Sequence, residues 1–142
     1  MFERLYFLRE SKDMSQEELA KVLGITRSNI SKWEKGTVTI PLKHLLKYAN
    51  YFNVSIDYIV GLSDKKEIII QNIVLDKAKI AKRLKDFRKQ KNLSLRELAH
   101  ELNTTSSTIS AYETEKCLIL TSFAYQIAKN YGLSMDWLLG LT

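Results

Sequence analysis

The feature that most constrains the fold of this chain is an internal repeat. Residues 4–63 align without a gap with residues 83–142, and about one third of the paired positions hold the same residue. Such a repeat is one folding unit that occurs twice. We therefore predict two tandem domains, residues 1–63 and 76–142, joined by a linker over residues 64–75. Each domain is near the lower size limit at which a chain folds alone.

Each copy is predicted to contain five short helices, because capping residues recur at the same places in both. The Ser-x-x-Glu capping box at 15–18, repeated at 94–97, marks the start of the second helix. Gly24 or Asn103 ends that helix, and a Thr two residues later caps the third. Pro41 is expected at the first position of the fourth helix.

The second and third helices of each copy are joined by a turn of three to four residues and form a helix-turn-helix unit. In the first copy, Leu19, Ala20 and Leu23 would pack against Ile30 and Trp33 across this turn. The pattern indicates an all-α fold with two small cores.

The run from Ser15 to Gly36, followed by the run from Val54 to Gly61, resembles the Cro/C1-type (XRE) helix-turn-helix family. The second copy resembles the family more loosely, and only the linker lies outside both matches. The resemblance implies a lambda-repressor-like domain of five helices in each copy. It also implies a sequence-specific transcriptional regulator that binds double-stranded DNA, a repressor of a bacterium or phage.

In this family the third helix of the domain enters the major groove. The resemblance implies base contacts from Arg27, Ser28 and Lys32, and the amide of Asn29 adds a group that can read adenine. The candidate contacts with the DNA backbone are Gln16, Lys35 and Thr37.

The second copy loses the strongest of these readers. Arg27 becomes Ser106, Lys32 becomes Ala111, and Leu95 stands where the first copy has a glutamine. Small hydroxyl side chains can still contact phosphates. The possible contacts left to the second domain are Ser106, Ser107 and Thr108. We therefore expect the first domain to read DNA, as part of a homodimer; the alternative is an intrachain pseudo-dimer with one half-site for each copy.

Two pairs of opposite charges also recur: Arg9 with Glu34, and Arg88 with Glu113. The resemblance suggests that each pair ties the first helix of its domain to the third. We interpret all four residues as structural, although Arg9 as a DNA ligand is an alternative.

The net charge of +6 is concentrated in the first helix of the second copy, where residues 77–91 hold eight Lys and Arg and one Asp. This run is expected to be a solvated face, with a non-specific phosphate track as the alternative.

Residues 68–75 of the linker are mostly apolar, and apolar side chains are unfavourable in a linker exposed to water. We therefore expect them to be buried between the copies or against a second chain.

Several function classes are excluded by composition. One Cys and two His give no metal-ligand set, and no glycine-rich phosphate loop occurs, so we expect no metal, no cofactor and no enzymatic activity. No apolar run is long enough to span a membrane, and no signal sequence opens the chain, so a cytoplasmic location at the bacterial nucleoid is expected. The alternative function is a protein-interaction module, inhibitor or antitoxin-like, that holds a protein partner through its second domain.

Overall fold

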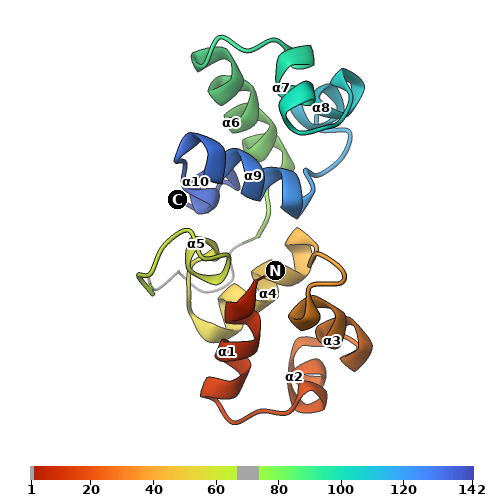
Figure 1. The fold of residues 1–142 in the computed structure, drawn as a ribbon, viewed down its shortest axis with the longest axis vertical. Coiled ribbons are helices and arrows are strands. Elements are labelled where there is room, and N and C mark those ends of the chain that lie inside the picture. Colours follow the sequence, from red (N-terminus) through yellow and green to blue (C-terminus); the bar gives the residue numbers. More distant parts are fainter. Residues whose placement is uncertain (1, 67–73) are drawn as a thin grey trace. The chain divides into compact units, whose positions relative to one another are not determined.

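A computed structural model describes residues 2–66 and 74–142, and its contacts divide the chain into two compact units, Met1–Ile73 (unit 1) and Val74–Thr142 (unit 2). Each unit closes around its own core (Figure 1). The part of the chain that the structure describes contains helices and no strand. The predicted all-α fold of two helix-turn-helix domains is therefore confirmed, whereas the boundaries at 63 and 76 stay a prediction.

Each unit contains five helices among its described residues. Those of unit 1 are α1 (Glu3–Ser11), α2 (Gln16–Leu23), α3 (Arg27–Lys35), α4 (Leu42–Phe52) and α5 (Ile56–Ile59). Those of unit 2 are α6 (Lys77–Gln90), α7 (Leu95–Glu101), α8 (Ser106–Glu113), α9 (Thr121–Tyr131) and α10 (Met135–Leu138). The order of helices thus repeats from one unit to the next.

Both capping boxes are present and fix the starts of α2 and α7. The Ser15 hydroxyl accepts the Glu18 amide at 3.0 Å, and the Glu18 carboxylate accepts the Ser15 amide at 3.1 Å; Ser94 and Glu97 repeat both bonds at the same distances. Beyond the helix ends, Gly24 and Asn103 take left-handed backbone angles, φ 66° and 59°. These local signals confirm the predicted turn between the two helices of each helix-turn-helix unit.

The prediction for Pro41 was wrong by one residue. Pro41 is the N-cap of α4 with an extended backbone, φ −64° and ψ 152°, and the helix begins at Leu42. Its carbonyl accepts the Leu45 amide at 2.9 Å, which is the first intrahelical bond that an N-cap residue supplies. A proline serves there because the N-cap position needs no amide hydrogen.

The core of each unit is built from the apolar faces of its helices. In unit 1 the side chains that contact across the turn, Leu19, Ile30 and Trp33, are at most 4% exposed. In unit 2 the equivalent residues Leu98, Ile109 and Tyr112 are buried as well. The interpretation of these residues as packing residues is confirmed.

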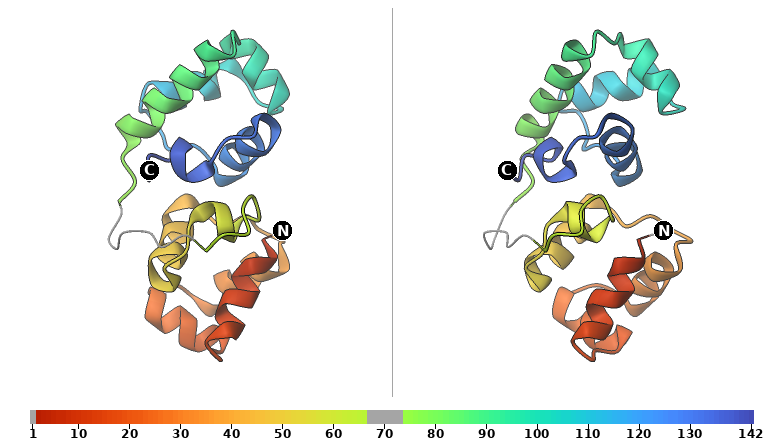
Figure 2. Two further views of the ribbon diagram at one scale, coloured as in Figure 1. Left: turned by 90° about the vertical axis from the view of Figure 1, so that its left-hand side faces the viewer. Right: turned by 60° about the vertical axis from the view of Figure 1, so that its left-hand side comes forward.

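An arginine ties the last short helix of each unit to the first. Arg4 of α1 donates to the Tyr58 carbonyl of α5 at 2.7 Å, and its guanidinium lies 4.3 Å from the centre of the Tyr58 ring. Arg83 of α6 does the same with the carbonyl and ring of Trp137 in α10. Figure 2 shows α10 beside the N-terminal half of α6, where this contact lies.

A buried ion pair links the first helix of each unit to the third. Two guanidinium nitrogens of Arg9 donate to the two carboxylate oxygens of Glu34 at 2.8 and 2.9 Å, and Arg88 and Glu113 repeat the pair at 2.7 and 2.9 Å. The four side chains are between 5% and 13% exposed. The hydrogen bond to the carboxylate raises the pKa of each arginine above its ordinary value.

Each arginine of these pairs also reaches the loop between the first two helices. A third nitrogen of Arg9 donates to the Met14 carbonyl at 2.7 Å, and the corresponding nitrogen of Arg88 donates to the Leu93 carbonyl at 2.9 Å. One side chain thereby fixes the first helix, the third helix and the loop that leads into the second.

The apolar run predicted to pack as part of the linker lies largely outside the described residues. Of residues 68–75, the structure describes only Val74 and Leu75, and Val74 is 79% exposed.

We expect Arg88→Met to lower the free energy of unfolding of unit 2 by roughly 3–5 kcal/mol, because it leaves the Glu113 carboxylate buried and unpaired. Urea denaturation followed by Trp137 fluorescence, in a Trp33→Phe background, measures this loss. The matched control is Lys82→Met, which breaks the exposed Lys82–Asp86 pair and is expected to change stability by no more than about 0.5 kcal/mol. Equal losses from the two variants would contradict a special role for the buried pair.

Candidate nucleic-acid interface

The residue spacing of α3 places its buried side chains and its cationic side chains on different sides of the helix. Successive residues of a helix turn by about 100°, so Ile30 and Trp33 lie on one side and a stripe of polar residues lies opposite. The stripe lines a shallow groove on the surface of unit 1. Its lining residues are Arg27, Ser28, Ser31, Lys32 and Lys35. We call this surface the α3 groove.

The α3 groove is rich in positive charge and in hydrogen-bond donors. Arg27, Lys32 and Lys35 are all exposed, and Ser28 and Ser31 place hydroxyl groups between them. Three cations within a single helix face suit a polyanion, and a guanidinium can bridge the two acceptor atoms of guanine in the major groove.

Sequence reasoning missed Ser31, which lines the groove from the turn after Arg27. The signal was present, because Ser31 is four residues after Arg27 and therefore shares its face. Asn29, in contrast, is half-buried and does not line the groove, and its backbone N–H donates to the Thr26 hydroxyl at 3.2 Å in the cap of α3. Asn29 lies on the flank of α3, next to the core side.

The three candidates for backbone contact occupy different environments. The side-chain amide of Gln16, in the first turn of α2, donates to Glu34 at 3.2 Å, so Gln16 is joined to the Arg9–Glu34 pair. Lys35 is exposed in the α3 groove. The Thr37 hydroxyl donates to the Lys32 carbonyl at 3.2 Å and helps to close the end of α3.

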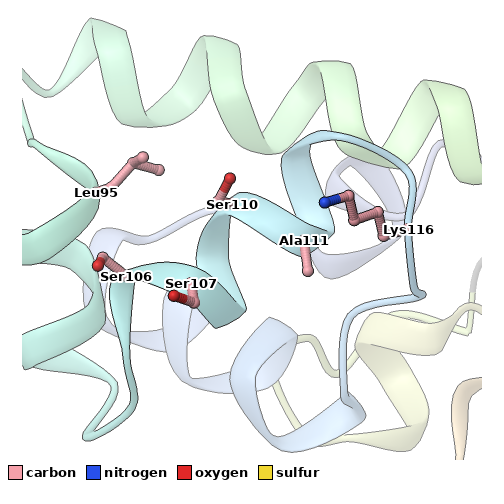
Figure 3. Close-up of a pocket in the computed structure, with 6 residues that line it drawn as sticks. All are labelled: Leu95, Ser106, Ser107, Ser110, Ala111 and Lys116. Atoms are coloured by element: carbon pink, nitrogen blue, oxygen red, sulfur yellow. The ribbon is translucent and has the colours of Figure 1, made fainter.

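Unit 2 has a hollow at the equivalent place, shown in Figure 3. The residues that line it are Leu95, Ser106, Ser107, Ser110, Ala111 and Lys116. We call it the α8 hollow. Only one of these six side chains is charged, and in Figure 3 the amine of Lys116 points back over α8. The two units thus share the shape of this surface and differ in its charge.

Two further substitutions change the surface around the α8 hollow. Leu95 stands at the position of Gln16, and its side chain has no hydrogen-bond donor to offer Glu113. Thr108 does not line the hollow; its hydroxyl lies 3.0 Å from the Thr105 hydroxyl, within the cap of α8. Ser106 and Ser107 are exposed, so they remain the available hydroxyl groups at the start of this helix.

The described residues contain no group of three or more His, Cys, Asp or Glu side chains placed to hold a metal ion. Within the same residues no helix is long and apolar enough to cross a bilayer.

Comparison with known protein families now defines the class. The family described as Helix-turn-helix matches residues 5–59, and that described as Helix-turn-helix domain matches residues 81–142. Both matches contain the paired helices described above, α2 with α3 and α7 with α8. The protein is a tandem helix-turn-helix protein. The chain belongs to the Cro/C1-type (XRE) helix-turn-helix family, as the resemblance predicted.

Relatives with curated names carry the same domain. An uncharacterized HTH-type transcriptional regulator of Methanocaldococcus jannaschii, MJ0272, is 39% identical over 64 residues, which are 45% of this chain and 97% of that protein. The uncharacterized HTH-type transcriptional regulator YobD of Bacillus subtilis is 37% identical over 62 residues, 44% of this chain and 55% of YobD. The antitoxin PezA of Streptococcus pneumoniae is 37% identical over 54 residues, 38% of this chain and 34% of PezA.

The chain spans about half the length of YobD and about a third of PezA. No solved structure gives a significant match.

The end of α8 differs from that of α3 in a way that affects stability. Gly36 follows α3 with φ 78°, and Glu115 takes the equivalent left-handed backbone with φ 65°. We expect Glu115→Gly to raise the free energy of unfolding of unit 2 by about 0.5–1 kcal/mol, because glycine adopts this conformation without a Cβ clash. Glu115→Gln removes the charge and keeps the Cβ, so it is the control and should give no such gain. Thermal unfolding of the three proteins measures the difference; equal gains would show that charge, and not backbone conformation, is responsible.

Proposed function

We propose that this protein is a sequence-specific DNA-binding transcriptional regulator, a repressor, in which unit 1 inserts α3 into the major groove. The observation that carries the proposal is the α3 groove, whose cations Arg27, Lys32 and Lys35 lie opposite the buried Ile30 and Trp33. A repressor of this kind acts by occupying a promoter, in the cytoplasm of a bacterium and at its nucleoid.

The base contacts in this proposal come from the first two turns of α3. Arg27 and Lys32 reach guanine acceptors, Ser28 donates from between them, and Asn29 reads a base at the flank. Gln16 meets a phosphate at the start of α2, together with the free amides of that helix end. Lys35 and Thr37 follow the backbone at the other end of α3.

Unit 2 supports binding without reading sequence. The α8 hollow offers hydroxyl groups from Ser106 and Ser107 and one cation, Lys116, which suit phosphate contacts and not base discrimination. Thr108 contributes to this binding indirectly, because its hydroxyl is held in the cap at the start of α8, 3.0 Å from the Thr105 hydroxyl. Paired half-sites then require a homodimer with two copies of unit 1, or else an intrachain pseudo-dimer in which each unit takes one half-site.

Two observations favour a second function. The relative PezA is named as an antitoxin, and Leu95 places an apolar side chain in the α8 hollow where unit 1 has a glutamine. In this alternative the protein is an interaction module that holds a protein partner through unit 2, and DNA binding is secondary.

Selection of bound duplexes from a random pool distinguishes these functions. One enriched motif without symmetry supports reading by unit 1 alone, and an inverted repeat supports a homodimer. A pool without enrichment would reject the sequence-specific regulator and favour the interaction module.

We expect Arg27→Ala combined with Lys32→Ala to weaken binding to the selected duplex by about a hundredfold or more, since each base contact of this kind contributes roughly 1–3 kcal/mol. The matched change in unit 2, Ser106→Ala with Ser107→Ala, should weaken it by no more than about threefold. Fluorescence anisotropy at fixed salt measures both. Equal losses would rule out the assignment of reading to unit 1.

Lys35→Ala is expected to weaken binding to all duplexes alike and to reduce the slope of log K against log salt by about one, because Lys35 neutralises a phosphate in the proposal. The measurement is a salt titration on the selected and a scrambled duplex. The control is Lys43→Ala, an exposed lysine of α4 outside the α3 groove, which should leave the slope unchanged. A loss confined to the selected duplex would instead make Lys35 a base reader.

A further inference from the structure

The first helices of the two units carry opposite charges on the same face. In α1 the exposed residues at positions i, i+3, i+4 and i+7 form one stripe along the helix, the acidic stripe: Glu3, Tyr6, Phe7 and Glu10. In α6 the equivalent exposed residues form the basic stripe: Lys82, Lys85, Asp86 and Lys89. A surface that is the same by fold has therefore become opposite in charge.

The acidic stripe exposes two aromatic rings between its carboxylates. Tyr6 is 43% and Phe7 58% exposed, and the rings meet edge to face with their centres 5.5 Å apart. Glu3 is exposed, and Glu10 lies 3.2 Å from Arg9 yet keeps half of its side chain exposed. The Arg9 guanidinium lies 5.3 Å from the centre of the Tyr6 ring, and the parts of the two rings that stay exposed mark a contact surface.

The basic stripe offers the groups that would cover these rings. Lys82 forms an exposed pair with Asp86 at 2.7 Å, and Lys85 and Lys89 are exposed beside it. Lysine stems are apolar and their ammonium groups are attracted to the faces of aromatic rings. With three lysines and one aspartate, the basic stripe has a net charge opposite to that of the acidic stripe.

We propose that the acidic stripe of one molecule docks on the basic stripe of a second copy of this chain, and that the reciprocal contact closes a dimer. Glu3 and Glu10 stand at the two ends of one stripe and Lys82 and Lys89 at the two ends of the other. Carboxylates therefore face ammonium groups whether the helices run parallel or antiparallel. The contact is independent of DNA.

Charge also decides against other pairings of the same helices. Two acidic stripes would place Glu opposite Glu, and two basic stripes would place Lys opposite Lys, so neither helix favours its own copy. Since each chain carries both stripes, two chains offer two such contacts, and the proposed dimer uses both.

The test mixes two variants in the absence of DNA. Variant A carries Glu3→Lys and Glu10→Lys, so both of its stripes are positive; variant B carries Lys85→Glu and Lys89→Glu, so both of its stripes are negative. We expect the natural protein to sediment as a dimer over about 1 to 100 µM. Each variant alone should associate with an affinity at least about tenfold lower. An equimolar mixture of A and B should regain dimers, because each contact then joins opposite charges.

Three controls make the result decisive. Circular dichroism must show that A and B keep the helical content of the natural protein; if either does not, Phe7→Ala replaces it as a variant that weakens the dimer without reversing charge. Glu17→Lys with Glu115→Lys changes the net charge as much as variant A does, at exposed positions outside the stripe, and should leave dimers intact. Higher salt should weaken the dimer of the natural protein, since exposed ion pairs are screened.

A natural protein that stays monomeric over this range would overturn the proposal, and so would a mixture of A and B that stays monomeric. If the natural protein forms dimers but the mixture of A and B does not, the dimer contact lies outside the two stripes. A loss of DNA affinity in variant B, with its association unchanged, would assign the basic stripe to phosphates instead.

Discussion

The orientation of α3 depends on a buried pair of charges. Arg9 holds both oxygens of Glu34 and also the loop carbonyl of Met14, so a single guanidinium sets α1, α3 and the entry to α2 in one arrangement. A pair of this kind is weak as a source of net stability, because both ions lose water. Its planar, bidentate geometry is specific, however, and it aligns the α3 groove with the rest of unit 1.

The same pair survives in unit 2 although the surface above it has changed. Arg88 and Glu113 keep their distances to within 0.1 Å of those in unit 1, while the neighbouring glutamine has become Leu95. Buried charge cannot be removed one partner at a time without a large loss, so both partners are retained. The exposed face of α8 is not part of the core, so Ser106 and Ala111 can stand there in place of Arg27 and Lys32 at little cost to folding.

The sequence predicts well what local chemistry determines. Helix starts follow from Ser15, Thr26 and their counterparts, and the buried positions follow from helical spacing, since both are set within a few residues along the chain. Pro41 was misplaced because a proline suits both the N-cap and the first turn. The bonds that engage the Thr37 and Thr108 hydroxyls depend on how each helix end closes, and residue types alone do not reveal that. Asn29 stands outside the α3 groove because helical spacing puts it beside the buried Trp33, four residues further on. The stripes on α1 and α6 emerge only when the exposed residues of the two units are compared.

Because each unit has its own core, the order of synthesis determines when the first folded domain of this protein appears. The side-chain caps of α2, α3 and α5 and the Arg9–Glu34 ion pair all lie within residues 2–66. Domains fold from the N-terminus as the ribosome releases them, at about 5–20 residues per second. Unit 1 can therefore be complete several seconds before the last helix of unit 2 is made. During that interval the nascent chain already presents the α3 groove, while it is still held close to the ribosome and its RNA.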